Sequence, residues 1–92
     1  MIRSIRHKGL KRLYSEDDPR GVAVEHAVKL LDILARLDAA GSVTDMDVPG
    51  MNLHPLKGEK KGLWAVTVRA NWRVIFRFDG QHAADVDYVD YH

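Results

Sequence analysis

The sequence predicts an α+β fold in which two N-terminal helices pack on one face of a small, mainly antiparallel sheet. Apolar residues recur at helical spacing in the first 40 residues, whereas they alternate with polar residues from residue 64 onward. Helices that precede a run of strands favour separate α and β layers over alternating βαβ units. Since 92 residues suit one compact domain, we predict a single domain over residues 1–92.

The first half of the chain predicts a short strand and two helices. Residues 2–5 alternate between apolar and polar, and residues 7–14 carry apolar side chains at helical spacing. Asp17-Asp18-Pro19 predicts the start of a second, longer helix, because aspartate caps helices and proline fits their first turn. Gly41 is placed to end it. The predicted buried face of this helix comprises Val24, Ala27, Val28, Leu31, Leu34 and Ala35, widened by Leu30, Ile33 and Leu37.

The second half predicts three strands, over residues 64–69, 72–78 and 83–91. Turns at Ala70-Asn71 and Asp79-Gly80 separate them, and Pro55 and Gly58 mark residues 56–57 as a connector. The apolar face of the middle strand points to the helices, so Arg73 and Arg77 point to the opposite face. We expect that face to be open, because helices cover only one side of the sheet.

The composition excludes several classes of protein. The chain has no cysteine, which excludes a disulfide framework and any thiolate metal site. It has no apolar run near 18 residues, and no apolar stretch follows its basic start, so we expect neither a membrane span nor a signal peptide. A cytoplasmic location fits best.

Charge is segregated along the chain although the net charge is only +1. Residues 1–13 carry +5, residues 14–50 carry −5, residues 51–77 carry +5 and the last fifteen carry −4. A protein that meets a polyanion with one face needs such a pattern, but chance clustering on solvated faces also produces it. Candidates for docking on RNA are Arg6, Lys8, Lys11, Arg12, Lys60 and Lys61.

Candidate catalytic residues lie between His54 and His92. Cleavage of RNA by its own 2′-hydroxyl requires a group that takes a proton, a group that gives one, and cations that stabilise the phosphorane. His54, Asp90, Tyr91 and His92 can cover the proton transfers, and Lys57, Arg69 and Arg73 can hold the phosphate. A lone histidine is more often a packing residue, so His7, His26 and His82 are set aside. This chemistry needs no metal, although two histidines and Asp90 leave a zinc site open.

Three stretches resemble the HigB toxins, which belong to the RelE-like toxin superfamily. They are Leu53-His54-Pro55-Leu56-Lys57-Gly58, Val66-Thr67-Val68-Arg69-Ala70-Asn71-Trp72-Arg73 and Asp90-Tyr91-His92. The opening Met1-Ile2-Arg3-Ser4 and His7-Lys8-Gly9-Leu10-Lys11 are also similar, so the likeness covers nearly the whole chain. Only residues 42–51 show little match, which leaves antitoxin contacts and ribosome docking open.

The resemblance implies a RelE-like microbial ribonuclease fold, no cofactor, and cleavage of messenger RNA in the ribosomal A site. It also implies a helix-turn-helix antitoxin of the HigA type, through which alone the chain would meet operator DNA. The functional positions that it implies are His54, Lys57, Arg69, Arg73, Asp90, Tyr91 and His92.

Two other classes of function are open on the sequence alone. One is a non-catalytic module that binds RNA or the ribosome, and the other is a corepressor of the antitoxin that uses the basic residues 3–12. The basic N-terminal helix fits ribosomal RNA or the antitoxin equally well. Which tail residue acts as base, and which histidine as acid, is also open.

Overall fold

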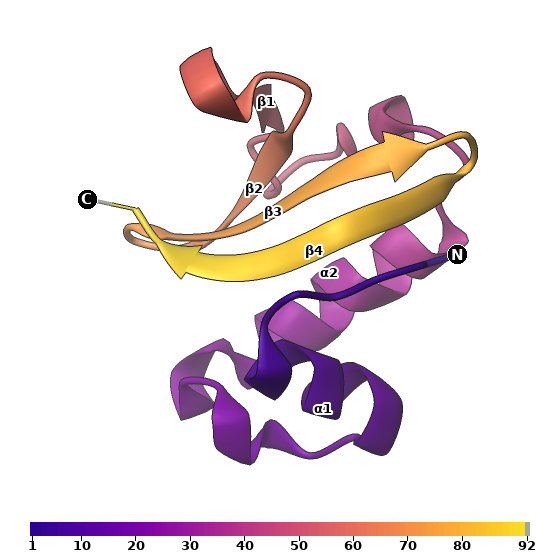
Figure 1. Ribbon diagram of the computed structural model, residues 1–92. Helices are drawn as coiled ribbons and strands as arrows, with labels where there is room; N and C mark the ends of the chain where they lie inside the picture. Colours follow the sequence, from indigo (N-terminus) through magenta and orange to yellow (C-terminus); the bar gives the residue numbers. More distant parts are fainter. Residues whose placement is uncertain (92) are drawn as a thin grey trace.

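Two α-helices lie beneath a twisted four-stranded sheet in the computed structural model, which describes residues 1–91 (Figure 1). The strands pair antiparallel in the order β1-β2-β3-β4. The helices and strands are α1 (Lys8–Glu16), α2 (Ala27–Ala39), β1 (His54–Pro55), β2 (Trp64–Arg69), β3 (Trp72–Asp79) and β4 (His82–Asp90). Short 3-10 turns connect them, namely η1 (Pro19–Gly21), η2 (Val24–His26), η3 (Val43–Met46) and η4 (Gly58–Lys60). The predicted α+β class and its two layers are confirmed.

The main core fills the space between the helices and one face of the sheet. Its fully buried side chains come from both layers, with Phe76 the largest of them. Burial at this scale contributes about 1.5–3 kcal/mol for each large apolar side chain. The core comprises Leu10, Leu13, Leu30, Ile33, Leu34, Leu37, Met46, Met51, Val66, Val74, Phe76, Val86 and Tyr88, among others.

The second helix begins later than predicted and buries a different face. Asp18 accepts a hydrogen bond from the backbone N–H of Arg20, but it caps the turn η1 and not the helix, which starts at Ala27. Val24 and Val28, predicted to be buried, are each 82% exposed. Ala35 and Leu31 are also exposed, whereas the buried face is formed by Leu30, Ile33, Leu34 and Leu37. Those four positions follow the i, i+3, i+4, i+7 spacing of one helix face, so the predicted centre of the stripe was wrong.

The opening segment is extended, as predicted, but it is not a regular strand. Ile2 and Ile5 form isolated parallel bridges with Ala83 and Val86 of β4. The pairing between the opening segment and β4 is interrupted because Asp85 adopts a left-handed conformation, with φ of 51°, at a bulge in β4. The segment therefore covers part of the edge of β4 without adding a fifth strand.

The face of the sheet away from the helices is only partly open, which corrects the prediction of an open face. The short strand β1, which the sequence analysis missed, pairs with β2 and extends the sheet at that edge. A second apolar cluster lies on this outer face, formed by Leu56, Ala65 and Ile75 with Leu63 and Val89 packed against it. Functional side chains on the outer face therefore surround a small apolar floor.

Within residues 1–91, no helix has both the length and the apolar character that crossing a membrane would require.

Candidate active site

The pairing register brings three of the predicted site residues to the outer face of the sheet. His54 opposes Ala65, which opposes Ile75, and Arg73 lies two residues from Ile75 on the same face of β3. Arg73 opposes Val89, and Tyr91 continues the alternation of β4 two residues later. The strands that carry His54 and Arg73 are two strand spacings apart, roughly 10 Å, and Arg73 lies two residues further along β3 than the position in line with His54. The apolar floor described above lies among them.

His54 is held in a defined orientation by the backbone. Its Nδ1 lies 2.8 Å from the carbonyl oxygen of Asn52. Since a carbonyl only accepts, Nδ1 carries the proton in the neutral ring and Nε2 is left as the acceptor. Asn52 has a φ of 51°, a left-handed conformation that asparagine tolerates better than most residues. The half-buried imidazole can therefore take or give a proton at Nε2 while its orientation is preserved.

Arg73 is oriented by the tight turn between β2 and β3. Its Nη1 donates to the carbonyl oxygens of Ala70 and Trp72, the latter at 3.1 Å. Ala70 presents its carbonyl because it adopts a left-handed conformation, with φ of 50°. Guanidinium has five N–H donors, so those not used by these carbonyls are available for a phosphate.

Arg77 shares the outer face with Arg73 but is already paired. Its Nε donates to the Asp85 carboxylate at 2.7 Å, and this hydrogen bond raises the pKa of Arg77 above its usual value. The ion pair makes Arg77 a weaker candidate for RNA binding than Arg73.

The two described residues of the tail, Asp90 and Tyr91, lie on different faces of the sheet. Asp90 opposes Trp72 across β3 and β4, so alternation places it on the side of Trp72, which packs against the main core. Tyr91 donates its backbone N–H to the carbonyl oxygen of Asn71 at 2.8 Å, which ties the tail to the β2–β3 turn. The predicted role of His92 concerns a residue outside the described range.

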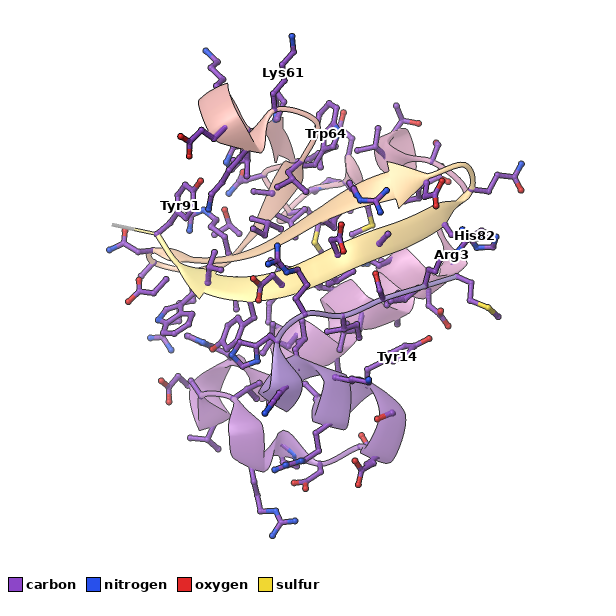
Figure 2. All side chains as sticks on the ribbon, in the orientation of Figure 1. Arg3, Tyr14, Lys61, Trp64, His82 and Tyr91 are labelled. Carbon is purple, nitrogen blue, oxygen red and sulfur yellow. The ribbon has the colours of Figure 1, made fainter. Side chains whose placement is uncertain are left out.

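The turn η4 folds over toward the tail. The ammonium of Lys60 lies 5.3 Å from the centre of the Tyr91 ring, within the range of a cation–π interaction. Figure 2 shows Tyr91 and Lys61 on the side of the sheet away from the helices, with Tyr14 on the helix side. Lys57, exposed, is the residue that precedes η4. Lys60, predicted as a docking residue, therefore lies beside a predicted catalytic residue.

The other predicted basic residues are more scattered. Arg69 is exposed and pairs with Trp72 through a bulge in β2, at the end of the sheet near the β2–β3 turn. The exposed residues Lys8, Lys11 and Arg12 belong to α1, on the opposite side of the sheet from His54. Arg6, also exposed, precedes that helix. The basic segments thus form two separate faces.

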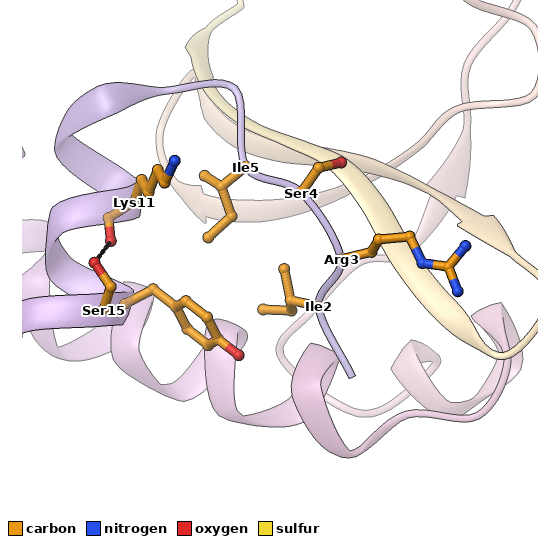
Figure 3. A pocket seen from close by; sticks show the side chains of 7 residues that line it. Ile2, Arg3, Ser4, Ile5, Lys11 and Ser15 are labelled. Carbon is orange, nitrogen blue, oxygen red and sulfur yellow. Dashed lines mark hydrogen bonds between the residues drawn. The ribbon is translucent and has the colours of Figure 1, made fainter.

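Two surface hollows lie on the helix side, away from the candidate site. One, of about 280 Å³, is lined by Arg3 and Lys11 among residues of the opening segment and α1 (Figure 3). The other, of about 460 Å³, lies between α1 and α2. In the described part of the chain, no cluster of three or more histidine, cysteine, aspartate or glutamate side chains could hold a metal ion.

One cluster near the tail escaped the sequence analysis. His26, which had been set aside, is 4% exposed, and its Nδ1 forms a hydrogen bond with the Tyr88 hydroxyl. Tyr88 in turn stacks on Trp72 with ring centres 4.6 Å apart. No local signal could have revealed this contact, because His26 and Tyr88 are 62 residues apart in sequence.

Comparison with solved structures first defines the class of fold. A YoeB/ParE toxin from Agrobacterium tumefaciens superposes with a TM-score of 0.51 at 20% identity, covering 100% of this chain and 99% of that one. At this level of identity the likeness shows a shared fold alone.

Sequence comparison then gives the family. Residues 3–92 match the family described as the RelE-like toxin of type II toxin–antitoxin system HigB. The endoribonuclease HigB of Proteus vulgaris is 40% identical over 92 residues, covering 100% of both chains. This chain belongs to the HigB-like toxin family, which confirms the resemblance stated above.

Proposed function

We propose that this chain is an endoribonuclease that cleaves messenger RNA in the ribosomal A site. The observation that carries the proposal is the shared outer face of His54, Arg73 and Tyr91, on a member of a toxin family with a relative named as an endoribonuclease. In the reaction the 2′-oxygen bonds to the adjacent phosphorus as the bond to the 5′-oxygen breaks. One proton leaves the 2′-hydroxyl and another joins the departing 5′-oxygen, so the products are a cyclic phosphate and a 5′-hydroxyl.

The residues of the chain supply both kinds of group that the reaction needs. Of the two predicted bases, Tyr91 shares the outer face with His54 and helps to activate the 2′-hydroxyl, whereas Asp90 starts from the other face. His54 or His92 gives a proton to the leaving oxygen. His54 suits the acid role because its Nδ1–H stays on the Asn52 carbonyl while Nε2 gains and loses the proton. Arg73 and Lys57, with Arg69, stabilise the negative charge on the phosphorus, and no metal takes part.

The spacing of the site favours a requirement for the ribosome. His54 lies roughly 10 Å across the sheet from the strand that carries Arg73, so both groups can act on one phosphate only when the RNA is held in a defined path between them. Ordering of the substrate by the ribosome supplies that path. Positioning of this kind can lower the activation barrier by about 7–11 kcal/mol. The basic face of α1, and Lys60 of η4 with the following Lys61, provide docking surfaces for ribosomal RNA.

Membership of a type II family implies an antitoxin partner. We infer that the partner is a helix-turn-helix protein of the HigA type, and that the toxin meets operator DNA only through it. Cleavage of cytoplasmic messenger RNA places the chain in the cytoplasm.

The test is to map transcript 5′ ends after a short induction of the chain in cells. We expect new 5′ ends inside translated codons, in a fixed register with the reading frame. A reporter transcript without its start codon, which ribosomes do not translate, should stay intact. Growth arrest without new 5′ ends would refute the nuclease and indicate a ribosome-binding module instead. Cleavage of the untranslated reporter would refute ribosome dependence.

Variants of the tail test the site within the same assay. Tyr91→Ala and deletion of His92 should each abolish growth arrest and new 5′ ends while the purified protein still unfolds cooperatively. Arg20→Ala is the matched control, because the Arg20 side chain is 83% exposed and pairs with Asp18, on the helix side. Full toxicity of both tail variants would refute the proposed site.

A further inference from the structure

A buried aromatic cluster links the helix layer to the end of the sheet that carries the tail. His26 reaches it from η2, just before α2, and Trp72 and Tyr88 reach it from β3 and β4. The His26 ring meets both partners edge to face, at 5.5 Å from the centre of Trp72 and 5.9 Å from that of Tyr88. His7 packs edge to face on Tyr88 at 5.2 Å. Such contacts hold rings in defined orientations.

The hydrogen bond at the centre of the cluster joins two buried side chains, His26 and Tyr88. Burial raises the pKa of Tyr88, so its phenol keeps its proton. The phenol donates to Nδ1 of His26 when the ring carries its proton at Nε2, and it accepts from Nδ1 in the other tautomer. In either tautomer the bond holds the Tyr88 hydroxyl against the imidazole.

The cluster lies at the last residue pair between β3 and β4, which positions the tail. Trp72 directly opposes Asp90, and Tyr88 precedes Asp90 by two residues on the same face. The residue before Trp72 is Asn71, whose carbonyl oxygen accepts the N–H of Tyr91. A change in the tilt of Trp72 or Tyr88 is thus transmitted to both described residues of the tail within one or two peptide units.

We propose that His26 is a positioning residue for RNA cleavage: its hydrogen bond to Tyr88, and the stack of Tyr88 on Trp72, hold Asp90 and Tyr91 in place. The inference rests on the proposed function, since it assumes that the tail takes part in the reaction. His26 does not touch the substrate, because it is buried on the helix side of the sheet.

The experiment combines amide hydrogen exchange with cleavage kinetics. Tyr88→Phe removes one hydroxyl and keeps the ring, and His26→Leu removes the imidazole that bonds to that hydroxyl. In both variants we expect the amide of Tyr91 to exchange at least tenfold faster than in the parent protein, relative to the amide of Val74 in the middle of β3. The turnover of ribosome-bound messenger RNA should fall at least fivefold at saturating ribosomes, with KM changed by less than twofold.

Three further variants distinguish positioning from a general loss of stability. His26→Gln keeps a side chain that can donate or accept a hydrogen bond, so it should recover part of the turnover that His26→Leu loses. Ile33→Val trims the core on α2 and serves as the destabilised control, which should change neither the Tyr91 exchange ratio nor turnover. The double variant of His26→Leu with Tyr88→Phe should be no slower than the worse single variant, since both remove one interaction.

The outcomes separate this inference from the proposed function. An unchanged Tyr91 exchange ratio in Tyr88→Phe overturns the positioning role, whatever happens to activity. Faster exchange with unchanged turnover overturns it as well, and also refutes a catalytic tail. If His26→Leu does not fold, Tyr88→Phe alone decides, because it removes a single oxygen atom.

Discussion

Gly9 of α1 and Gly21 at the end of η1 meet backbone to backbone, with no space for a side chain between them. A Cβ atom on Gly9 would lie 2.0 Å from the carbonyl oxygen of Gly21, and one on Gly21 would lie 2.5 Å from the Cα of Gly9. This contact lets the segment after α1 fold back across that helix before α2 begins.

Gly9→Ala should therefore destabilise the protein by at least about 1–3 kcal/mol, the usual cost of overpacking, because the clash is with backbone that cannot rotate away. Urea unfolding followed by circular dichroism measures the change. Gly80→Ala is a useful contrast, since nothing lies within 4 Å of its added methyl group and its cost comes from a φ of 63° alone. An unchanged stability of Gly9→Ala would mean that η1 does not pack on α1 as described.

Arg73 and Arg77 provide a matched pair of outer-face arginines. Arg73→Ala should weaken binding to ribosomes and reduce its salt dependence, because an oriented guanidinium that contacts phosphate is lost. Arg77→Ala should change affinity by less than about twofold, since Asp85 already neutralises Arg77. Sedimentation with ribosomes across a series of salt concentrations measures both. Equal losses for the two variants would contradict the assignment.

The corrected face of α2 can be checked by stability alone. Val28→Lys should change the free energy of unfolding by less than about 0.5 kcal/mol, as an exposed substitution does. Ile33→Ala should cost about 2–5 kcal/mol, because Ile33 is fully buried in the main core. If thermal unfolding showed a larger loss of stability for Val28→Lys than for Ile33→Ala, the buried face predicted from the sequence would be the correct one.

Asp38 makes the stability of the protein depend on pH. Its carboxylate accepts hydrogen bonds from the Ile2 N–H at 3.0 Å and the Tyr14 hydroxyl at 2.8 Å, and the backbone bond is the main cause that lowers the pKa of Asp38. A lowered pKa stabilises the folded state above the ordinary value of 3.8, and this contribution disappears as pH falls through the lower folded value.

Asp38→Asn removes that titration, so its free energy of unfolding should fall less than that of the parent protein between pH 5 and pH 3. The difference should stay below about 1 kcal/mol, since the Asp38–Tyr14 bond is exposed. Urea unfolding at closely spaced pH values measures it. Parallel curves for the two proteins would show that Asp38 does not anchor the opening segment.

The strands were easier to predict than the helices for a physical reason. In β3 the arginines lie on one face and the aromatic residues on the other, so only one assignment of the buried face fits the sequence. In α2 apolar residues occupy too wide an arc, so periodicity alone does not choose between the face of Val28 and that of Ile33. The two-residue strand β1 depends entirely on its partner β2, which a local pattern does not reveal.

The candidate site divides in the same way. His54, Arg73 and Tyr91 could be proposed from residue chemistry and from family resemblance, and pairing across the sheet then places them on one face. The position of Asp90 on the other face depends on the register of β4 after its bulge, which no local pattern encodes. Likewise, His26 acquires its role only through a partner 62 residues away.

The bridges between the opening segment and β4 have a consequence for biosynthesis. Ser4 accepts a hydrogen bond from the Asp85 N–H, across 81 residues of sequence. During translation residues 2–5 must wait for almost the whole chain before they find their partners, and the helices wait for the sheet that completes their core. The opening segment therefore joins the fold only after residues 82–90, which form β4, have been synthesised.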